Sequence, residues 1–229
     1  MAHGENDGPL ADWLSLFGIS WPGRRPAPWT PGPSKRVEQV HTSRVLRRLV
    51  EVLRLVEHPS LLDLGPLSGS NVNFFGSVLG GRLVVNDIYS VLDAAARRAA
   101  PGGLGPVIER AMTEPCDSLD GVLCWDLFDY LDADEAAALA REVARVLKPG
   151  GAALAMFATV PYDGGEFTRF TIEDLDHIRY RPQAASLSQQ QVQLGREVVQ
   201  IVRPLLADET YLLAHGEREA LLRKPRVSA

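Results

Sequence analysis

The order of apolar segments predicts an α/β fold: a doubly wound, mostly parallel sheet of seven strands, with helices on both faces and an antiparallel hairpin at the C-terminus. Two observations indicate this class. Short apolar runs typical of buried strands alternate with longer helical patterns, as in β-α-β units. The end of the chain differs, because two strand patterns flank a His215-Gly216 turn. That hairpin adds an antiparallel strand to an otherwise parallel sheet.

The expected helices follow from apolar residues spaced three and four positions apart. The first is expected over 34–56, where His58-Pro59 ends it. Asp132 and Glu135 have the spacing of a capping box at the start of a later helix. The other expected helices are 70–79, 90–99, 133–147, a short helix from about Thr171, and one capped by Ser188 and Gln191 that reaches Arg203.

The expected strands are short and apolar, and the clear ones are 61–64, 83–86, 121–125, 152–157, 209–214 and 219–223. Residues 100–119 are ambiguous. Pro101-Gly102-Gly103 interrupts the chain there, and 106–112 has a weak strand pattern. With that segment included, the count reaches seven strands.

Residues 1–33 are expected to form an N-terminal arm, separate from a domain over 34–229. Five of the twelve residues from Pro22 to Pro33 are proline, which favours an extended connector. Before this connector, an apolar face is spaced for a short amphipathic helix: Leu10, Trp13, Leu14 and Phe17. The arm either docks on the domain or acts as a lid or partner-binding segment.

The composition is that of an ordinary globular protein. The chain has 229 residues and a formal net charge of -5, which argues against a nucleic-acid partner. No apolar run approaches the length of a membrane span, and the N-terminus lacks the order of a signal peptide. Cys116 and Cys124 form no CxxC pair, so no metal site is expected. We therefore expect a cytoplasmic protein with no membrane partner; the oligomeric state stays open.

A candidate ligand site follows the first two strands. Asp63, Gly65 and Gly69 come at the carboxyl end of the first strand, where parallel sheets bind ligands. Glycine lets backbone approach a ligand closely, and the next helix presents free N–H groups. Asp87 ends the second strand, where a carboxylate can accept hydrogen bonds from ribose hydroxyls. The unit predicts a nucleoside-bearing cofactor; the alternatives are a tight turn without ligand and, for Asp87, a helix N-cap.

These segments resemble the class I S-adenosylmethionine-dependent methyltransferases over residues 36–224. Leu61-Leu62-Asp63-Leu64-Gly65 with Gly69 resembles their acid-x-Gly-x-x-x-Gly first motif. Further segments similar to family motifs are Val85-Asn86-Asp87-Ile88, Asp120 to Asp126 with Tyr130-Leu131, and Leu147 to Gly151. The terminal hairpin fits the family's antiparallel last strand. The resemblance implies a Rossmann-like methyltransferase fold.

The resemblance also implies a role for each motif residue toward S-adenosyl-L-methionine. The backbone at Gly65 and Gly69 would face its methionine and ribose part, and Asp63 would orient its amino end. Asp87 would hold the ribose hydroxyls, with Ile88 beside the adenine. The wall between cofactor and acceptor would be formed by Cys124, Trp125 and Asp126.

Two departures from the family pattern stand out. Leu67 occupies the position of the usual middle glycine. The ambiguous segment 100–119 shows no clean equivalent of the acid that contacts the adenine amino group, although Glu114 and Asp117 are candidates.

The acceptor side is harder to interpret, because methyl transfer from a sulfonium needs a base only when the acceptor must lose a proton. Asp126 is the candidate base or acceptor-orienting group, and a cap on the next turn is its alternative. The other acceptor-side candidates are Asp129, Tyr130, Tyr162, Glu166 and Arg169, with Arg179 and Arg181 for an acidic acceptor or simply at the surface. We expect His41 to pack within the first helix and His177 to be solvated.

The leading hypothesis is a methyltransferase that transfers a methyl group from S-adenosyl-L-methionine to a small-molecule acceptor. The alternative is a catalytically degenerate methyltransferase-fold binding or scaffold protein, which the irregular segment 100–119 favours. A nicotinamide-dependent oxidoreductase would require G-x-G-x-x-G, which Gly65, Leu67 and Gly69 do not supply.

Overall fold

The computed structural model describes residues 37–161, 166–185, 187 and 195–226. The expected arm over 1–33 lies outside the described residues, as do Tyr162 and the expected caps Ser188 and Gln191.

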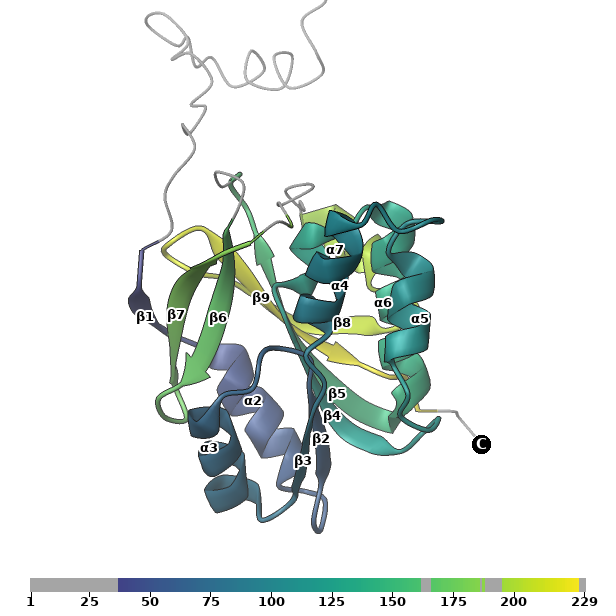
Figure 1. Ribbon diagram of the computed structural model, residues 1–229. Helices are drawn as coiled ribbons and strands as arrows, with labels where there is room; N and C mark the ends of the chain where they lie inside the picture. The colour runs from purple at the N-terminus through teal and green to yellow at the C-terminus, as the bar shows by residue number, and fades with distance from the viewer. Residues whose placement is uncertain (1–36, 162–165, 186, 188–194, 227–229) are drawn as a thin grey trace, which may run out of the picture. The chain divides into compact units, whose positions relative to one another are not determined.

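The main sheet of the described part has six strands in the order β3-β2-β4-β5-β9-β8 (Figure 1). The first four in that order are mutually parallel, whereas β9 runs antiparallel to both of its neighbours. The terminal hairpin is therefore confirmed. The strands are β2 (Ser60–Asp63), β3 (Arg82–Val85), β4 (Leu119–Trp125), β5 (Leu147–Ala158), β8 (Leu206–Leu212) and β9 (Glu217–Arg223).

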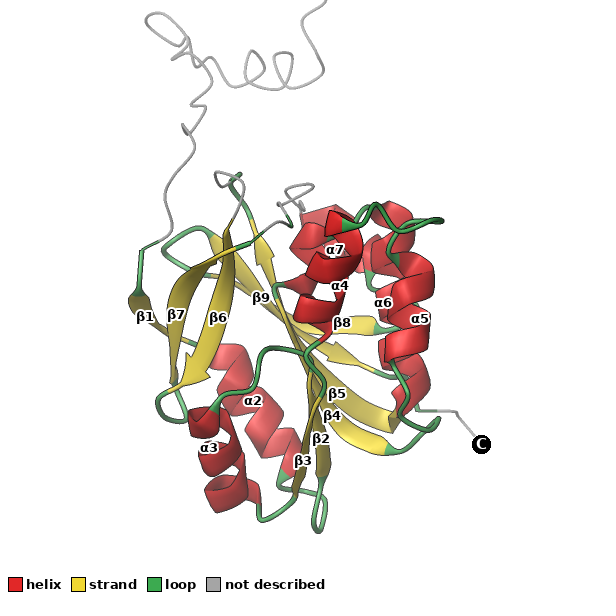
Figure 2. Cartoon of the chain, in the orientation of Figure 1, coloured by secondary structure: helices red, strands yellow, loops and turns green. Residues whose placement is uncertain are grey.

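Helices cover both faces of this sheet, as Figure 2 shows. The α2 and α3 helices pack on one face and α4, α5, α6 and α7 on the other. Successive residues of β4 alternate between the two cores, with Leu123 on the side of α2 and Val122 on the opposite side. The helices are α2 (Arg44–Leu53), α3 (Gly69–Leu79), α4 (Ile88–Arg97), α5 (Gly105–Ala111), α6 (Ala133–Val146) and α7 (Gly195–Ile201).

The capping box predicted before α6 is confirmed. Asp132 accepts a hydrogen bond from the Glu135 N–H, and the Glu135 side chain accepts one from the Asp132 N–H. These two bonds satisfy N–H groups that a helix start otherwise leaves without a partner, so the helix begins at a defined residue.

A second, three-stranded antiparallel sheet has the order β1-β7-β6. It consists of β1 (Gln39–Thr42), β6 (Glu166–Ile172) and β7 (His177–Ala184), and we call it the cap sheet. Its inner residues Phe170, Ile172, Ile178 and Tyr180 pack into the same core as α2. The cap sheet corrects two expectations. The first helix begins only at Arg44, because Ser43 caps it and 39–42 pair with β7; and His177 starts a strand, not a helix.

Residues 100–119 contain α5 in place of the expected weak strand, so the main sheet has six strands within the described residues in place of the expected seven. Pro106 lies in the first turn of α5, where a missing N–H is tolerated. Leu104, Val107 and Ile108 are spaced for one helical face and are buried against the core. The edge strand of the main sheet on this side is therefore β3.

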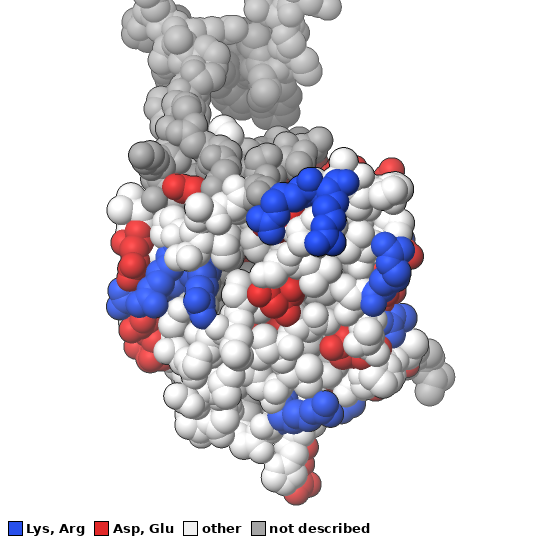
Figure 3. Space-filling view, in the orientation of Figure 1, with Lys and Arg blue, Asp and Glu red and all other residues white. Residues whose placement is uncertain are grey.

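In the described part of the chain, no helix combines the length and the apolar character that crossing a membrane requires. On the face drawn in Figure 3, acidic and basic side chains lie in small, interspersed groups.

Candidate active site

The glycine turn leaves β2 at Asp63, whose side chain is fully buried. Its Oδ1 accepts a hydrogen bond from the Gly65 N–H at 3.0 Å, and its Oδ2 accepts one from Asn71 Nδ2 at 3.2 Å. Burial raises the pKa of Asp63, while hydrogen bonds from Trp125, Gly65 and Asn71 oppose that rise. The carboxylate thus fixes the shape of the turn from within.

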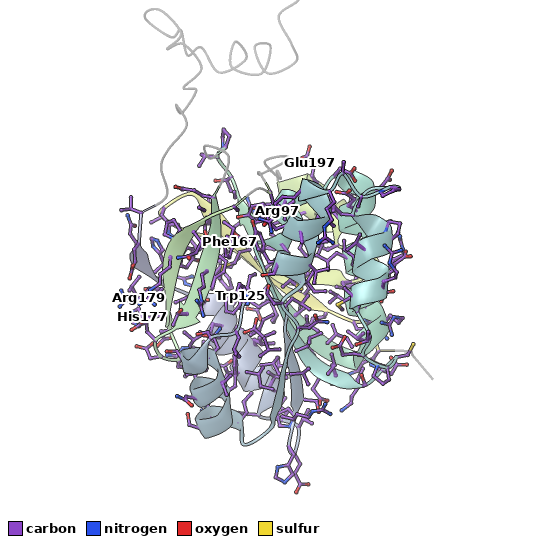
Figure 4. The ribbon with its side chains drawn as sticks, viewed as in Figure 1. Arg97, Trp125, Phe167, His177, Arg179 and Glu197 are labelled. Carbon is purple, nitrogen blue, oxygen red and sulfur yellow. The ribbon has the colours of Figure 1, made fainter. Side chains whose placement is uncertain are left out.

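Trp125 lies at the end of β4 and covers this turn. Its indole Nε1 donates to Asp63 Oδ1 at 2.7 Å, and a Cβ placed on Gly65 would lie 2.9 Å from the same ring. The indole stacks on Phe170 of the cap sheet, with ring centroids 5.0 Å apart and planes 6° apart. The residue has φ of 52°, a left-handed backbone that bulky side chains rarely adopt. Figure 4 labels Trp125, at the end of β4, and Phe167, on β6 of the cap sheet.

The remaining space at the strand ends is small. A cavity of about 10 Å³ is left there, which is the lower limit for one water molecule. Its lining joins the glycine turn, the end of β4 and the cap sheet: Gly65, Pro66, Tyr89, Trp125, Asp126, Leu127, Phe167, Thr168 and Phe170. Tyr89 stacks on Phe167 at 4.0 Å. Aromatic side chains thus fill most of the mouth of the sheet.

Asp87 is the N-cap of α4. Its Oδ1 accepts from the Ser90 N–H at 2.9 Å and its Oδ2 from the Ser90 hydroxyl at 2.7 Å. The side chain is only partly buried at the end of β3, so a ligand could still reach it. Ile88 and Cys124 differ, because both are fully buried in the core and neither borders the cavity. If Ile88 and Cys124 contact the cofactor, they must do so through their backbone atoms.

Asp126 borders the cavity and is 7% exposed. It precedes a short 3₁₀ turn over Leu127–Tyr130, yet its side chain makes no capping bond there. Instead its Oδ2 accepts a hydrogen bond from the Tyr130 hydroxyl at 3.0 Å. Asp129 has a structural task, since its Oδ2 accepts from the Ala158 N–H at 2.8 Å and joins the turn to β5. Only Asp126 of this pair lies where an acceptor could meet it.

The arginine candidates are engaged elsewhere. Arg169 donates to the Leu67 carbonyl and so connects the cap sheet to the glycine turn. Arg179 pairs with Glu173 and Glu38, and Arg181 pairs with Glu38 as well. His177 is 44% exposed at its side chain and contacts Asp174, in agreement with the solvated position expected for it. In Figure 4, His177 and Arg179 lie on β7, away from Trp125.

His41 belongs to β1 and packs in an aromatic cluster, not in a helix. Its ring stacks on His215 at 3.6 Å and meets Tyr180 edge-on at 4.6 Å. Burial and the neighbouring His215 lower the pKa of His41, and Glu217 opposes the change. The cluster lies beside a surface groove of about 700 Å³ between β1 and β8.

Of the two adenine candidates, Asp117 does not lie at the mouth of the sheet. The Asp117 N–H donates to the Arg145 carbonyl in the last turn of α6, and Lys224 pairs with its carboxylate. The Glu114 carbonyl accepts from the Arg145 side chain. The segment leads into the amino end of β4, opposite the glycine turn, so Asp117 is wrongly placed for an adenine contact.

Several site residues could not be chosen from the sequence alone: Asn71, Tyr89, Phe167 and Phe170. Asn71 comes two residues after Gly69, in the first turn of α3, which is a weak signal. The sequence signal for the cap sheet is an apolar residue at every second position, as in half-buried strands. These residues are Phe170 and Ile172 on one strand and Ile178 and Tyr180 on the next.

The backbone at the mouth of the sheet is suited to binding a nucleoside-bearing cofactor. A Cβ on Gly69 would meet nothing within 4 Å, so the start of α3 is open. Asp87 is accessible at the next strand end. The Trp125 indole, in contrast, lies on Gly65 itself. No group of three His, Cys, Asp or Glu residues among the described ones is arranged to hold a metal ion.

The comparisons with known proteins agree with this architecture. Residues 62–155 match the family described as a methyltransferase domain. No curated protein matches the sequence. The matched segment holds the glycine turn, the second strand end and Trp125 with Asp126.

Three solved structures illustrate the likeness. One is a 1,6-didemethyltoxoflavin-N1-methyltransferase of Burkholderia thailandensis with bound 1,6-didemethyltoxoflavin and S-adenosylhomocysteine, at 15% identity and TM-score 0.47, covering 80% of this chain and 79% of that one. A SAM-dependent methyltransferase of Methanosarcina mazei has 15% identity and TM-score 0.46, with 76% and 95% covered. The glycopeptide N-methyltransferase MtfA, complexed with S-adenosyl-L-methionine, has 15% identity and TM-score 0.43, with 79% and 92% covered.

The family match covers β3 and β4 with parts of β2 and β5, and the reversed β9 beside β5 agrees with the last strand that the resemblance implies. The family model thus identifies a methyltransferase domain over residues 62–155, the family that the sequence motifs of this segment resemble.

Proposed function

We propose that this protein transfers a methyl group from S-adenosyl-L-methionine to a small-molecule acceptor held between the glycine turn and the cap sheet. The observation that carries the proposal is the shared lining of the strand-end cavity. The glycine turn, Asp126 and the cap-sheet residues Phe167 and Phe170 meet there. A covered, aromatic site suits a small acceptor better than a macromolecule, which needs an open surface.

Each residue near the cavity has a proposed task. Gly65, Gly69 and the start of α3 bind the cofactor through backbone, with Asp63 at its amino end and Asp87 at its ribose. When bound, the cofactor supplies an electrophilic methyl group on a sulfonium. Asp126 orients the acceptor, or accepts its proton where the acceptor must lose one. The aromatic cover excludes water and holds the acceptor in line.

Calorimetric titration with S-adenosylhomocysteine, S-adenosyl-L-methionine and NAD tests the cofactor. We expect the first two to bind and NAD to fail. Binding to the folded state alone raises the free energy of unfolding by about 2.7 kcal/mol at a hundredfold excess over Kd, so the melting temperature rises with ligand. A folded protein that shows no shift at millimolar ligand would favour the degenerate binding or scaffold alternative.

A screen for release of S-adenosylhomocysteine tests the acceptor class. Small amines, phenols and carboxylic acids form one arm, and proteins and RNA form the other. Turnover with a compound of the first arm is expected. Turnover confined to the second would contradict the small-molecule acceptor while leaving the cofactor assignment intact.

A further inference from the structure

We propose that Trp125 is the gate of the cofactor site: its indole closes the glycine turn, and it leaves Asp63 when the amino group of the cofactor takes over that carboxylate. The inference rests on the proposed function, because it concerns the same cofactor. It adds a specific residue that controls entry and a specific bond that is exchanged.

The first observation is steric. The ring atoms of Trp125 lie 2.9 Å from where a Cβ on Gly65 would be. A distance below 3.0 Å leaves no room for any atom between that backbone and the indole. A ligand that approaches Gly65 from the side of its missing Cβ must therefore displace the ring.

The second observation is the bond itself. Trp125 Nε1 donates to Asp63 Oδ1 at 2.7 Å, in a place where Asp63 has no exposed surface. A buried carboxylate needs donors, and an N–H to a charged acceptor is one of the stronger protein hydrogen bonds. An ammonium group is an equally suitable donor. When such a group arrives, it can replace the hydrogen bond that Asp63 Oδ1 loses as the indole leaves.

The third observation is the backbone of Trp125. Its φ of 52° is left-handed, which for a bulky residue costs about 1–3 kcal/mol and persists only where the surroundings hold it. Here the bond to Asp63 and the stack on Phe170 hold it. Two contacts thus hold the indole in place, while the strain of its backbone favours its release. An element that moves needs opposing contributions of this kind.

The chain offers a matched control in Asn71. It also donates to Asp63, through Nδ2 at 3.2 Å to the other oxygen, but it does not border the cavity. Removing either donor takes one hydrogen bond from Asp63, and Asn71→Ala also removes the bonds of Asn71 to the Phe170 carbonyl and the Ile172 N–H of the cap sheet. Only Trp125→Phe removes the donor that belongs to the ring covering Gly65.

The test is S-adenosylhomocysteine affinity of the full chain, measured by calorimetry on folded Trp125→Phe and Asn71→Ala. Because the apparent Kd rises as the open fraction falls, loss of the indole bond should tighten binding about tenfold in Trp125→Phe. Asn71→Ala should bind no more tightly than the parent. Binding by Trp125→Phe but not by the parent would support the gate as well.

Two results overturn the gate. If the parent binds and Trp125→Phe binds equally or more weakly, the gate is wrong and the proposed function stands. If neither binds, both fail together.

A second measurement does not depend on that variant. In the full chain with Trp13, Trp21 and Trp29 changed to Phe, Trp125 is the sole tryptophan. Its side chain is nearly fully buried, with the residue 3% exposed. Saturating S-adenosylhomocysteine should shift its emission to longer wavelength and increase quenching by acrylamide. Unchanged emission and quenching at saturation would mean that the indole stays in place, which contradicts the gate.

Discussion

Three carboxylates at or near the strand ends have different surroundings and hence different tasks. Asp63 is sealed beneath Trp125, whereas Asp87 is accessible and caps a helix. Asp126 borders the cavity and bonds to Tyr130. The same residue type thus shapes a turn at Asp63 and caps a helix at Asp87, while at Asp126 it borders the cavity.

Asp87→Ala should weaken S-adenosylhomocysteine binding by about 1.5–3 kcal/mol, the usual worth of hydrogen bonds to a charged group. The change also removes the cap of α4. Asp132→Ala is the matched control, because it removes the cap of α6 far along the chain from the turn. Calorimetry should show weaker binding for Asp87→Ala alone. An equal loss of affinity in both variants would mean that Asp87 acts only as a helix cap.

Asp126→Asn keeps an oxygen for the Tyr130 hydroxyl but removes the negative charge. Once an acceptor that must lose a proton is known, kcat should fall about a hundredfold or more, as for loss of a general base. The Kd for S-adenosylhomocysteine should stay within twofold of the parent value, roughly. An unchanged kcat would exclude Asp126 as the base.

Glu219 gives a prediction for pH. It is fully buried and accepts hydrogen bonds from the Arg44 and Val45 N–H groups at the start of α2. Burial nevertheless raises its pKa above the usual 4.5. The folded protein therefore holds this proton more tightly than the unfolded chain does, so the contribution of Glu219 to stability is greatest below pH 4.5 and falls as the pH rises through the folded pKa.

Glu219→Gln removes that titration. Urea unfolding at several pH values should show the parent losing free energy of unfolding relative to the variant as the pH rises from 4.5. A difference between the two proteins that is independent of pH would contradict the assignment.

At the scale of elements, the cap sheet is joined to the glycine turn by side chains and not by strand pairing. Arg169 reaches the Leu67 carbonyl, Phe170 stacks on Trp125, and Asn71 donates to the Phe170 carbonyl and accepts from the Ile172 N–H. Because side chains alone make these contacts, the two sheets can share one core while the stack of Phe170 on Trp125 can still rearrange.

Phe170→Ala tests that connection. The side chain is 4% exposed, and deleting a buried phenyl ring costs about 3–5 kcal/mol of unfolding free energy. Urea unfolding should show this loss. Val72→Ala on the exposed side of α3 is the control, expected within about 0.5 kcal/mol of the parent. A small loss at Phe170 would mean that the cap sheet contributes little to the core.

At the scale of the whole molecule, every motif-bearing element follows residue 34. The two elements that precede the first motif, β1 and α2, begin at Gln39 and Arg44. On the interpretation of the arm over 1–33 as a lid, we predict that a protein starting at Ser34 stays folded and binds S-adenosylhomocysteine as the parent does, but loses most turnover. Circular dichroism, calorimetry and the turnover assay check these three points; unfolding on truncation would make the arm a core element instead.

Much of the main sheet could be predicted because parallel strands buried on both faces are short apolar runs. Strands expected over 61–64, 83–86 and 121–125 lie within a residue or two of β2, β3 and β4. The cap sheet could not be placed in this way, since its strands are half-polar and β1 pairs with a segment far along the chain. The α5 helix could not be predicted, because Pro101-Gly102-Gly103 immediately precedes it and its own helical spacing covers only seven residues.

The sequence by itself determined the β-α-β order, the glycine turn, the accessible Asp87 and the reversed last strand. Each of these follows from the local spacing of apolar residues and from the residues that form turns. Only the tertiary structure decided that Trp125 lies on Gly65 and bonds to Asp63. The bond joins residues 62 positions apart, which meet because β2 and β4 are parallel neighbours ending at one edge. Long-range pairing of this kind has no local signature, so the closed state of the site followed from packing alone.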